Sequence, residues 1–146
     1  MECLGGNGYV EEGILARHFR ESPVNAIWEG SGNVMCLDVL RALSREAEAA
    51  QAVLQALTSE TKGLSGAGDA VISIGKAFRR PDSERVARLA VEKLALLAAA
   101  AALNQVSPHH AELFARTRLA QTHAGMYGAV DLADRDIRGL LARALP

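Results

Sequence analysis

Glu29 is the residue of this sequence with the clearest capacity for proton transfer, because it lies between a large aromatic side chain, Trp28, and a glycine, Gly30. A carboxylate in a site that excludes water can act as a general base, and Gly30 and Gly32 leave space for a substrate. A simpler interpretation is an acidic residue near the start of a helix, where the helix dipole stabilises negative charge. Residue type alone favours the simpler interpretation, so catalysis by Glu29 is a hypothesis that needs further support.

The segment Leu4–Tyr9 concentrates three glycines in the sequence LGGNGY. Glycine lets another group approach the backbone closely. The segment is not a dinucleotide fingerprint, because Glu11 occupies the position of the third glycine, and no GKS or GKT sequence indicates a phosphate-binding loop. Two interpretations stay open: an ordinary turn, or a backbone contact to a cofactor or a neighbouring chain.

The second half of the chain carries most of the basic residues, although the net charge of the whole is −1. Residues 1–75 have five Lys/Arg and ten Asp/Glu, whereas residues 76–146 have eleven and seven. Candidates for weak contact with DNA phosphates, which need only positioned charge, are Arg79, Arg80, Arg85 and Arg88. Acidic residues are interleaved and no aromatic stacking platform accompanies them, so a solvated helix surface is the favoured interpretation.

The elements that must position these residues are predicted to be helices. Apolar residues recur at steps of three or four between Val34 and Leu57, which indicates one long helix with Ser31 as its N-cap. Further helices are expected at residues 11–19, 69–78 and 84–104 and from Pro108 onward. No alternating strand pattern occurs. The predicted fold class is all-α, most simply an antiparallel bundle of about four helices.

The composition agrees with packed helices. Hydrophobic residues make up 49% of the 146 residues and aromatic residues only 4%, so most apolar side chains are small or aliphatic. A chain of this length can bury a substantial core. The longest apolar run, residues 94–103, is too short to cross a membrane, and we expect no membrane association.

Cysteine and histidine predict no further site. Cys3 and Cys36 lack CxxC spacing and lie among apolar neighbours, which predicts buried, reduced thiols in a cytoplasmic protein. His109 and His110 are adjacent and would point apart on a helix, so we expect no bound metal.

The first third of the chain resembles the C-terminal signature of the acyl-CoA dehydrogenases. The matching motifs are GGNGY at Gly5–Tyr9, RHFRE at Arg17–Glu21 and IWEGS at Ile27–Ser31. Trp28, Ser31 and the following GNVMCLDVLR are similar to the AidB-like branch, the alkylation-response flavoproteins. The resemblance is dense over residues 2–43, and an all-helical tail supports it beyond them.

The resemblance implies an FAD-dependent oxidoreductase. In this family a glutamate at the position of Glu29 removes the α-proton of an acyl-CoA thioester while the β-hydride passes to FAD, and its backbone N–H helps to hold the thioester oxygen. Residues that match family positions near the cofactor are Gly5 and Gly6, toward FAD of a neighbouring subunit, and Ser31 and Asn33. Trp28 and Gly30 match the substrate side, and Arg17 and Arg20 are expected to form structural ion pairs.

The resemblance also divides the chain. Residues 1–62 correspond to the end of the family's C-terminal helical domain, and residues 63–146 to an additional helical region. The N-terminal domain and the β-barrel of the family have no counterpart in this sequence. We therefore expect a C-terminal fragment of a homo-oligomeric flavoprotein, inactive and without stoichiometric FAD on its own. The alternative is a helical interaction or DNA-associated module that uses the basic helices of residues 76–118.

Overall fold

The computed structural model describes residues 1–120 and 132–144, and these residues form helices and no strands. The α-helices are α1 (Ile14–Glu21), α2 (Gly32–Arg45), α3 (Ala47–Glu60), α4 (Ala67–Phe78), α5 (Ala87–Val106), α6 (Pro108–Arg118) and α7 (Asp134–Ala144). Three short 3₁₀ helices are η1 (Glu2–Gly8), η2 (Ser22–Ala26) and η3 (Ser83–Val86). The all-α prediction is confirmed. Among the described residues, no helix has the length and apolar character needed to cross a bilayer.

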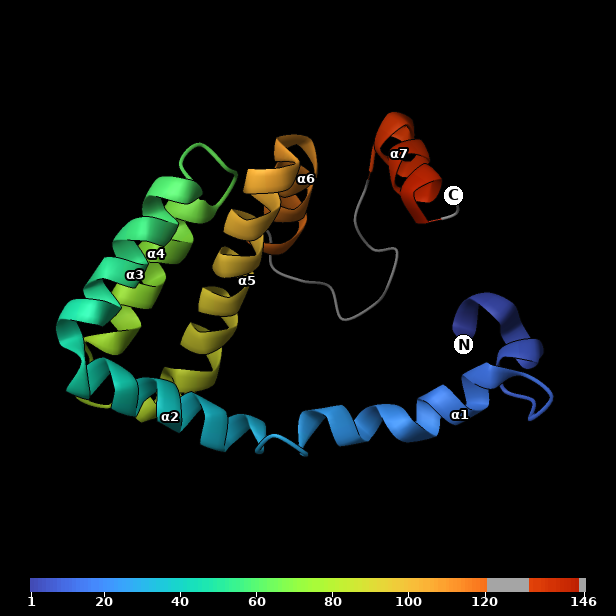
Figure 1. Cartoon of the computed structure of the whole chain (residues 1–146), viewed down its shortest axis with the longest axis horizontal. Helices are drawn as coiled ribbons and strands as arrows, with labels where there is room; N and C mark the ends of the chain where they lie inside the picture. The colour runs from blue at the N-terminus through green and yellow to red at the C-terminus, as the bar shows by residue number, and fades with distance from the viewer. Residues whose placement is uncertain (121–131, 145–146) are drawn as a thin grey trace.

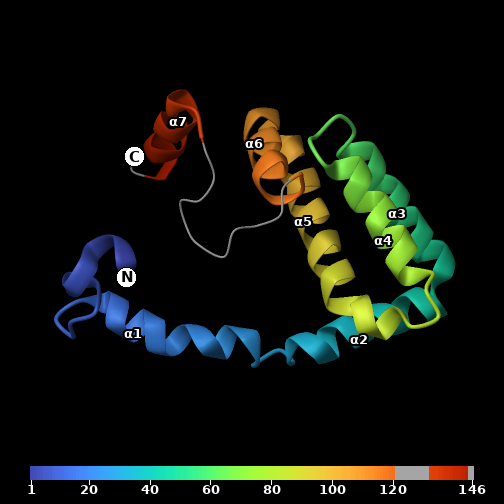
Figure 2. The same ribbon diagram turned by 180° about the vertical axis from the view of Figure 1, so that it is seen from behind.

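Helices α3, α4, α5 and α6 pack side by side as a bundle, and α2 crosses one end of it (Figure 1). Helix α5 is central, because it contacts α2, α3, α4 and α6. Residues 1–31, which contain η1, α1 and η2, extend away from the bundle, and we call them the arm. The view from behind shows the same separation between the arm and the bundle (Figure 2).

The core consists of small and aliphatic side chains, as the composition predicts. Its buried residues on α4 and α5 are Ala67, Ala70, Ile74 and Leu97, with Leu54 and Leu57 of α3 packed against them. The neighbouring faces of α5 and α6 bury alanines, which let the two helices approach closely; these are Ala100, Ala101, Ala111 and Ala115.

The single long helix predicted from Ser31 to Leu57 is wrong, because the helix stops at Glu46. Glu46 has a non-helical backbone (φ −126°, ψ 54°) and separates α2 from α3. The change of direction lets α3 lie along α4 and α5 while α2 crosses the end of the bundle (Figure 1). The helix predicted at residues 84–104 also differs, since η3 precedes α5 and α5 continues to Val106.

The connection between α3 and α4 is fixed to α6. The backbone N–H and the hydroxyl of Ser65 both donate to the Glu112 carboxylate, at 3.0 and 2.5 Å. These hydrogen bonds, first the one from the hydroxyl and then the one from the N–H, hold the pKa of Glu112 below its ordinary value. Gly66 has a positive φ of 75°, and a Cβ there would lie 2.4 Å from the backbone N of Ala120.

Helix α7 lies against α6 through one buried carboxylate. Asp136 is 4% exposed, and its oxygens lie 3.3 Å from His109 Nε2 and 3.5 Å from an Arg116 guanidinium nitrogen, both on α6. Arg135 of α7 approaches the same carboxylate at 3.4 Å. A buried charge needs such partners, so this cluster fixes where α7 can lie.

Candidate functional site

Glu29 lies in a tight turn between η2 and α2. Gly30 makes the turn with φ of 114°, a conformation that residues with a side chain rarely adopt, and its N–H donates to the Ile27 carbonyl at 3.1 Å. Ser31 follows with an extended backbone as the N-cap residue of α2, as predicted. The sequence Glu-Gly-Ser therefore places the Glu29 carboxylate directly before the N-terminus of a 14-residue helix.

The side chains of this turn are exposed to solvent. Glu29 is exposed, and the neighbouring Ile27 and Trp28 are 63% and 71% exposed. Large apolar side chains are also exposed along the rest of the arm, at Leu4, Tyr9, Ile14, Phe19 and Val24. A dry site around Glu29 would therefore need additional polypeptide as its cover.

The backbone N–H of Glu29 is available as a donor. Among the backbone hydrogen bonds formed outside the helices by the described residues, none is donated by this group, although Trp28 and Gly30 on either side donate to Val24 and Ile27. The geometry is therefore compatible with the predicted contact between this N–H and a thioester oxygen.

The glycines of the GGNGY segment differ in what surrounds them. A Cβ at Gly8 would lie 2.3 Å from the Met1 carbonyl oxygen, so the fold of η1 itself requires a glycine there. A Cβ at Gly5 or Gly6 would meet nothing within 4 Å. The space beside Gly5 and Gly6 can therefore accept a group from outside, as a backbone contact to a cofactor would require.

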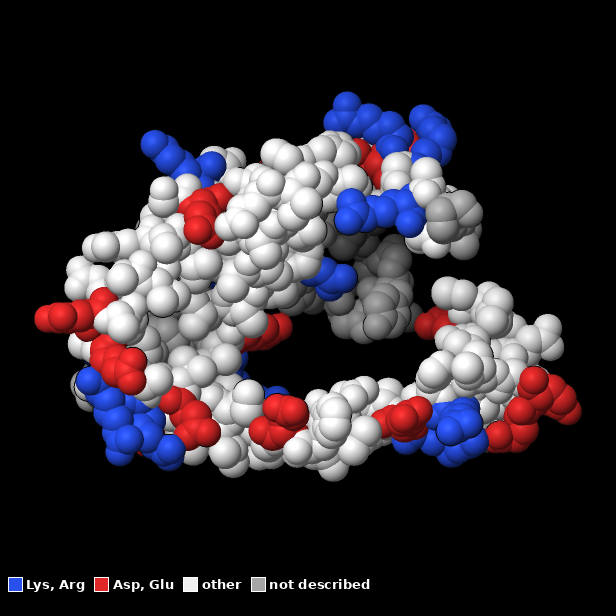
Figure 3. Space-filling view, in the orientation of Figure 1, with Lys and Arg blue, Asp and Glu red and all other residues white. Residues whose placement is uncertain are grey.

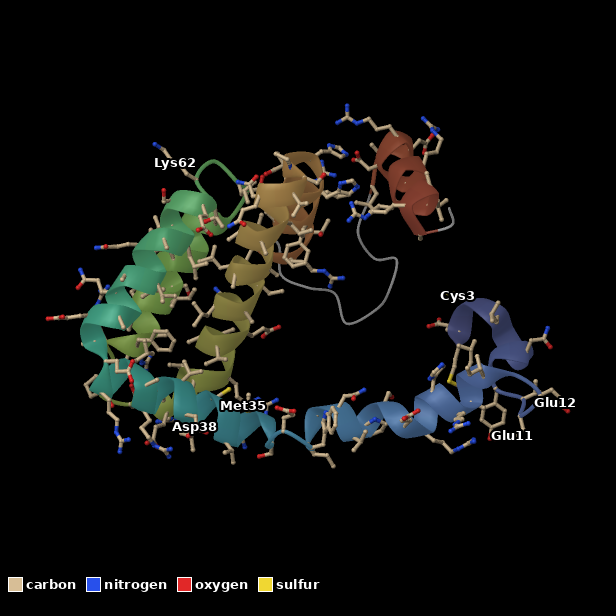
Figure 4. All side chains as sticks on the ribbon, in the orientation of Figure 1. Cys3, Glu11, Glu12, Met35, Asp38 and Lys62 are labelled. Atoms are coloured by element: carbon tan, nitrogen blue, oxygen red, sulfur yellow. The ribbon has the colours of Figure 1, made fainter. Side chains whose placement is uncertain are left out.

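The glycine segment and the Glu29 turn lie at opposite ends of the arm. Figure 4 labels Cys3 in η1 and Met35 in the first part of α2, with α1 between them. The two motifs therefore do not form one site within a single chain. Cys3, predicted to be buried, is exposed in η1, whereas Cys36 is buried as predicted.

Asn33, a predicted flavin-side residue, is held by α5. Its Oδ1 accepts a hydrogen bond of 3.0 Å from Arg88 Nη1, and Arg88 also lies beside Gly32, where a Cβ would be 3.6 Å from Nη1. Ser31 is exposed and makes no capping hydrogen bond with its side chain. Sequence reasoning missed the contribution of Arg88 to this turn, because 55 residues separate the two partners.

Two of the four arginines predicted to contact DNA form hydrogen bonds with other side chains of this chain. Arg80 donates to both carboxylate oxygens of Asp82, at 2.8 and 2.9 Å, which lowers the pKa of Asp82. Arg88 is directed at Asn33. On the face in Figure 3, both basic and acidic side chains lie along α2 and the arm. DNA contact by Arg79, Arg80, Arg85 and Arg88 stays a prediction.

An ion pair within the arm fixes α1 to the preceding loop. Arg20 donates to both oxygens of Glu11 at 2.6 and 3.0 Å, which raises the pKa of Arg20 and lowers that of Glu11. The structural role predicted for Arg20 is thereby confirmed. This contact shapes the arm and takes no part in the turn at Glu29.

Comparison with known proteins agrees with the resemblance. Residues 1–44 match the family described as acyl-CoA dehydrogenase, C-terminal domain. The chain is 40% identical over 146 residues to "Putative acyl-CoA dehydrogenase AidB" of Escherichia coli (strain K12), which covers 99% of this chain and 26% of that protein, in its C-terminal part. It is 50% identical over 44 residues to "Acyl-CoA dehydrogenase family member 11" of Caenorhabditis elegans, covering 30% of this chain and 7% of that protein.

One of these similarities extends further along the chain than the motifs do. The match to the Escherichia coli protein includes the tail beyond residue 60, where only the helical character supported the resemblance. The chain spans about a quarter of the length of that relative, as the 26% coverage states.

Proposed function

Since this chain corresponds to the C-terminal part of an AidB-like acyl-CoA dehydrogenase, we propose that it supplies one wall of a flavin-dependent acyl-CoA site. The observation that carries the proposal is the turn at Gly30, which presents the Glu29 carboxylate and the Glu29 N–H immediately before α2. The exposed apolar side chains beside it support a site completed by other polypeptide.

Glu29 is the proposed base of this site. Its carboxylate accepts the α-proton of an acyl-CoA thioester, and its backbone N–H donates to the thioester oxygen as negative charge develops there. Trp28 covers the acyl chain and excludes water, and Gly30 leaves room for the substrate because it has no side chain. FAD, when bound in the whole protein, supplies the acceptor for the β-hydride.

The proposed FAD contacts come from two places on the arm and α2. Gly5 and Gly6 have open space beside their backbones, which fits close approach by a cofactor held in a neighbouring subunit. Ser31 and Asn33 lie at the start of α2, on the same stretch of chain as Glu29. This arrangement supports a homo-oligomer, because the two motifs of one chain lie apart (Figure 4).

The chain divides, in this proposal, into residues 1–62, which end the dehydrogenase C-terminal domain, and residues 63–146, which form an additional helical region. We propose that the isolated chain does not bind FAD stoichiometrically, since the described residues offer the base and glycine contacts without a cover for them. Free thiols at Cys3 and Cys36 support a cytoplasmic location.

A chimera tests the proposed function. This chain replaces the matching C-terminal part of the Escherichia coli relative, and acyl-CoA-dependent reduction of bound flavin is measured over a set of acyl chain lengths. Glu29→Gln is expected to lower the reduction rate by about 10²–10⁴-fold, the usual contribution of a general base, with flavin content unchanged.

Glu12→Gln is the matched control, because it removes an exposed carboxylate of the arm outside the turn. It is expected to keep the full rate. An unaltered rate in Glu29→Gln, with Glu12→Gln also unaltered, would show that the base is another residue.

A further inference from the structure

Arg88 connects the turn that carries Glu29 to the packed bundle. It lies on the second position of α5, between Ala87 and Ala90, which are 3% and 2% exposed. Its backbone is therefore fixed by the core, while its side chain is exposed and reaches α2. Nη1 donates to Asn33 Oδ1 at 3.0 Å, and a Cβ at Gly32 would lie 3.6 Å from the same nitrogen.

The first turn of α2 lacks the usual side-chain stabilisation. Ser31 is its N-cap residue and makes no capping hydrogen bond with its hydroxyl. Among the described residues, the bond from Arg88 is the side-chain hydrogen bond that ties Gly32 or Asn33 to another helix. A first turn without a capping side chain frays readily, so the hydrogen bond from Arg88 is expected to stabilise the first turn of α2.

The positive charge of Arg88 alone would not stabilise the N-terminus of α2, beside which its guanidinium lies. The N-terminus of a helix is the positive end of the helix dipole, where a cation is unfavourable. The favourable contribution must come from the directed hydrogen bond to Asn33, and that bond determines where the first turn of α2 points.

We propose that Arg88 is a positioning residue for the segment Glu29–Asn33. It fixes Asn33 relative to α5, and Asn33 in turn fixes the start of α2 and the Gly30 turn before it. Its effect on the orientation of the segment follows from the contacts above. Its effect on catalysis rests on the proposed function of Glu29.

Trp28 reports on this segment without any cofactor, because it is the only tryptophan of the chain and precedes Glu29 directly. The purified chain and the variants Arg88→Ala, Asn33→Ala and the double variant are compared by acrylamide quenching and anisotropy of Trp28. Amide hydrogen exchange of residues 35–37 is measured in parallel, because these amides donate to carbonyls of the first turn. Arg85→Ala is the control, since it removes the same charge from the neighbouring turn.

Either single variant is expected to raise exchange at residues 35–37, the first amides of α2 that donate to a carbonyl of the turn, by about fivefold, the effect of losing one hydrogen bond of about 1 kcal/mol. Trp28 anisotropy falls in both variants, and the double variant adds nothing, because both changes remove the same bond. Arg88→Lys, which keeps a donor, restores part of the protection. Arg85→Ala behaves as the original chain, and far-UV circular dichroism confirms that all variants stay folded.

Two results would overturn the proposal: unchanged exchange and anisotropy in Arg88→Ala, or an equal change in Arg85→Ala. In the chimera, Arg88→Ala lowers kcat with KM nearly unchanged, as expected when the base is misplaced. The two proposals remain distinguishable, since the Trp28 and exchange measurements on the isolated chain require neither flavin nor catalysis by Glu29.

Discussion

Gly30 and Gly6, both in the candidate site, differ in whether the fold itself requires a glycine. Gly30 has φ of 114°, so an alanine there is strained whatever space surrounds it. Gly6 has neither a positive φ nor an atom within 4 Å of an added Cβ. Folding therefore requires a glycine at position 30 and not at position 6, and the external contact at Gly6 stays a prediction.

Gly30→Ala is accordingly expected to destabilise the turn by about 1–3 kcal/mol, the cost of a residue held at an unfavourable φ. Faster amide exchange at the start of α2 and a change in Trp28 fluorescence measure this effect. Gly6→Ala is the matched control and should leave the thermal midpoint of the isolated chain unchanged. A lowered midpoint in Gly6→Ala would show that η1 also depends on this glycine.

Local sequence predicted the position of Glu29 well and its surroundings poorly. Gly30 and Ser31 determine the turn and the helix start through backbone preferences that act over a few residues. The exposure of Glu29 and Trp28 depends on what packs over them, and that information lies outside the turn. The hydrogen bond between Asn33 and Arg88 depends on packing between α2 and α5, which no local pattern reveals.

At the scale of elements, periodicity identified the helices but not the break at Glu46. The apolar spacing continues across Glu46, and no glycine or proline marks the position. The break is a tertiary effect, since α3 must turn away from α2 to bury Leu54 and Leu57 against α4. Pro108 and Gly66, by contrast, mark helix starts through their own backbone properties.

The connection between α3 and α4 offers a test in which two glycines share a conformation and differ in space. Gly63 and Gly66 both have positive φ, 88° and 75°, but only at Gly66 would a Cβ meet backbone, 2.4 Å from Ala120 N. Gly63→Ala should lower the free energy of unfolding by about 1 kcal/mol through backbone strain. Gly66→Ala should lower it by more, about 3 kcal/mol, because the added Cβ would also collide with the backbone of Ala120.

Chemical denaturation of the two variants measures the difference. Similar losses in free energy of unfolding would show that α6 can shift away from the α3–α4 connection at little cost.

The contact between Ser65 and Glu112 predicts a pH dependence of stability. The pKa of Glu112 is lowered in the folded chain, so its carboxylate contributes stability above the ordinary Glu pKa of about 4.3. That contribution is lost as pH falls through the folded pKa. Glu112→Gln should therefore lower the thermal midpoint at neutral pH, and the difference should shrink as the pH falls below about 4.

Ser65→Ala is the partner variant, since it removes the hydroxyl that contributes most to the lowered pKa. It should flatten the same pH dependence. A difference between Glu112→Gln and the original chain that persists undiminished at low pH would mean that packing, and not charge, accounts for the effect.

At the scale of the whole molecule, one core joins the two regions that the resemblance separates. Leu54 and Leu57 from the first region pack on Ala67, Ile74 and Leu97 from the second. The arm shares in none of this core, and most of its large apolar side chains are exposed. The bundle therefore has a core of its own, whereas burial of the exposed apolar side chains of the arm would need other polypeptide.

The isolated chain is accordingly expected to associate through its arm and to carry no stoichiometric flavin. Phe19 is 64% exposed on α1, and Phe19→Lys should shift the chain toward monomer because a charge cannot be buried between apolar faces. Val106→Lys is the matched control, since Val106 is 82% exposed at the end of α5, away from the arm. Light scattering after gel filtration gives the mass of each variant.

The absorbance spectrum of the same fractions gives the flavin content. Association that Val106→Lys weakens as strongly as Phe19→Lys does would place the contact on the bundle instead of the arm. One flavin per chain in the purified protein would show that arm and bundle bind the cofactor unaided, because no further domain would then be needed to cover Gly5, Gly6 and the turn at Glu29.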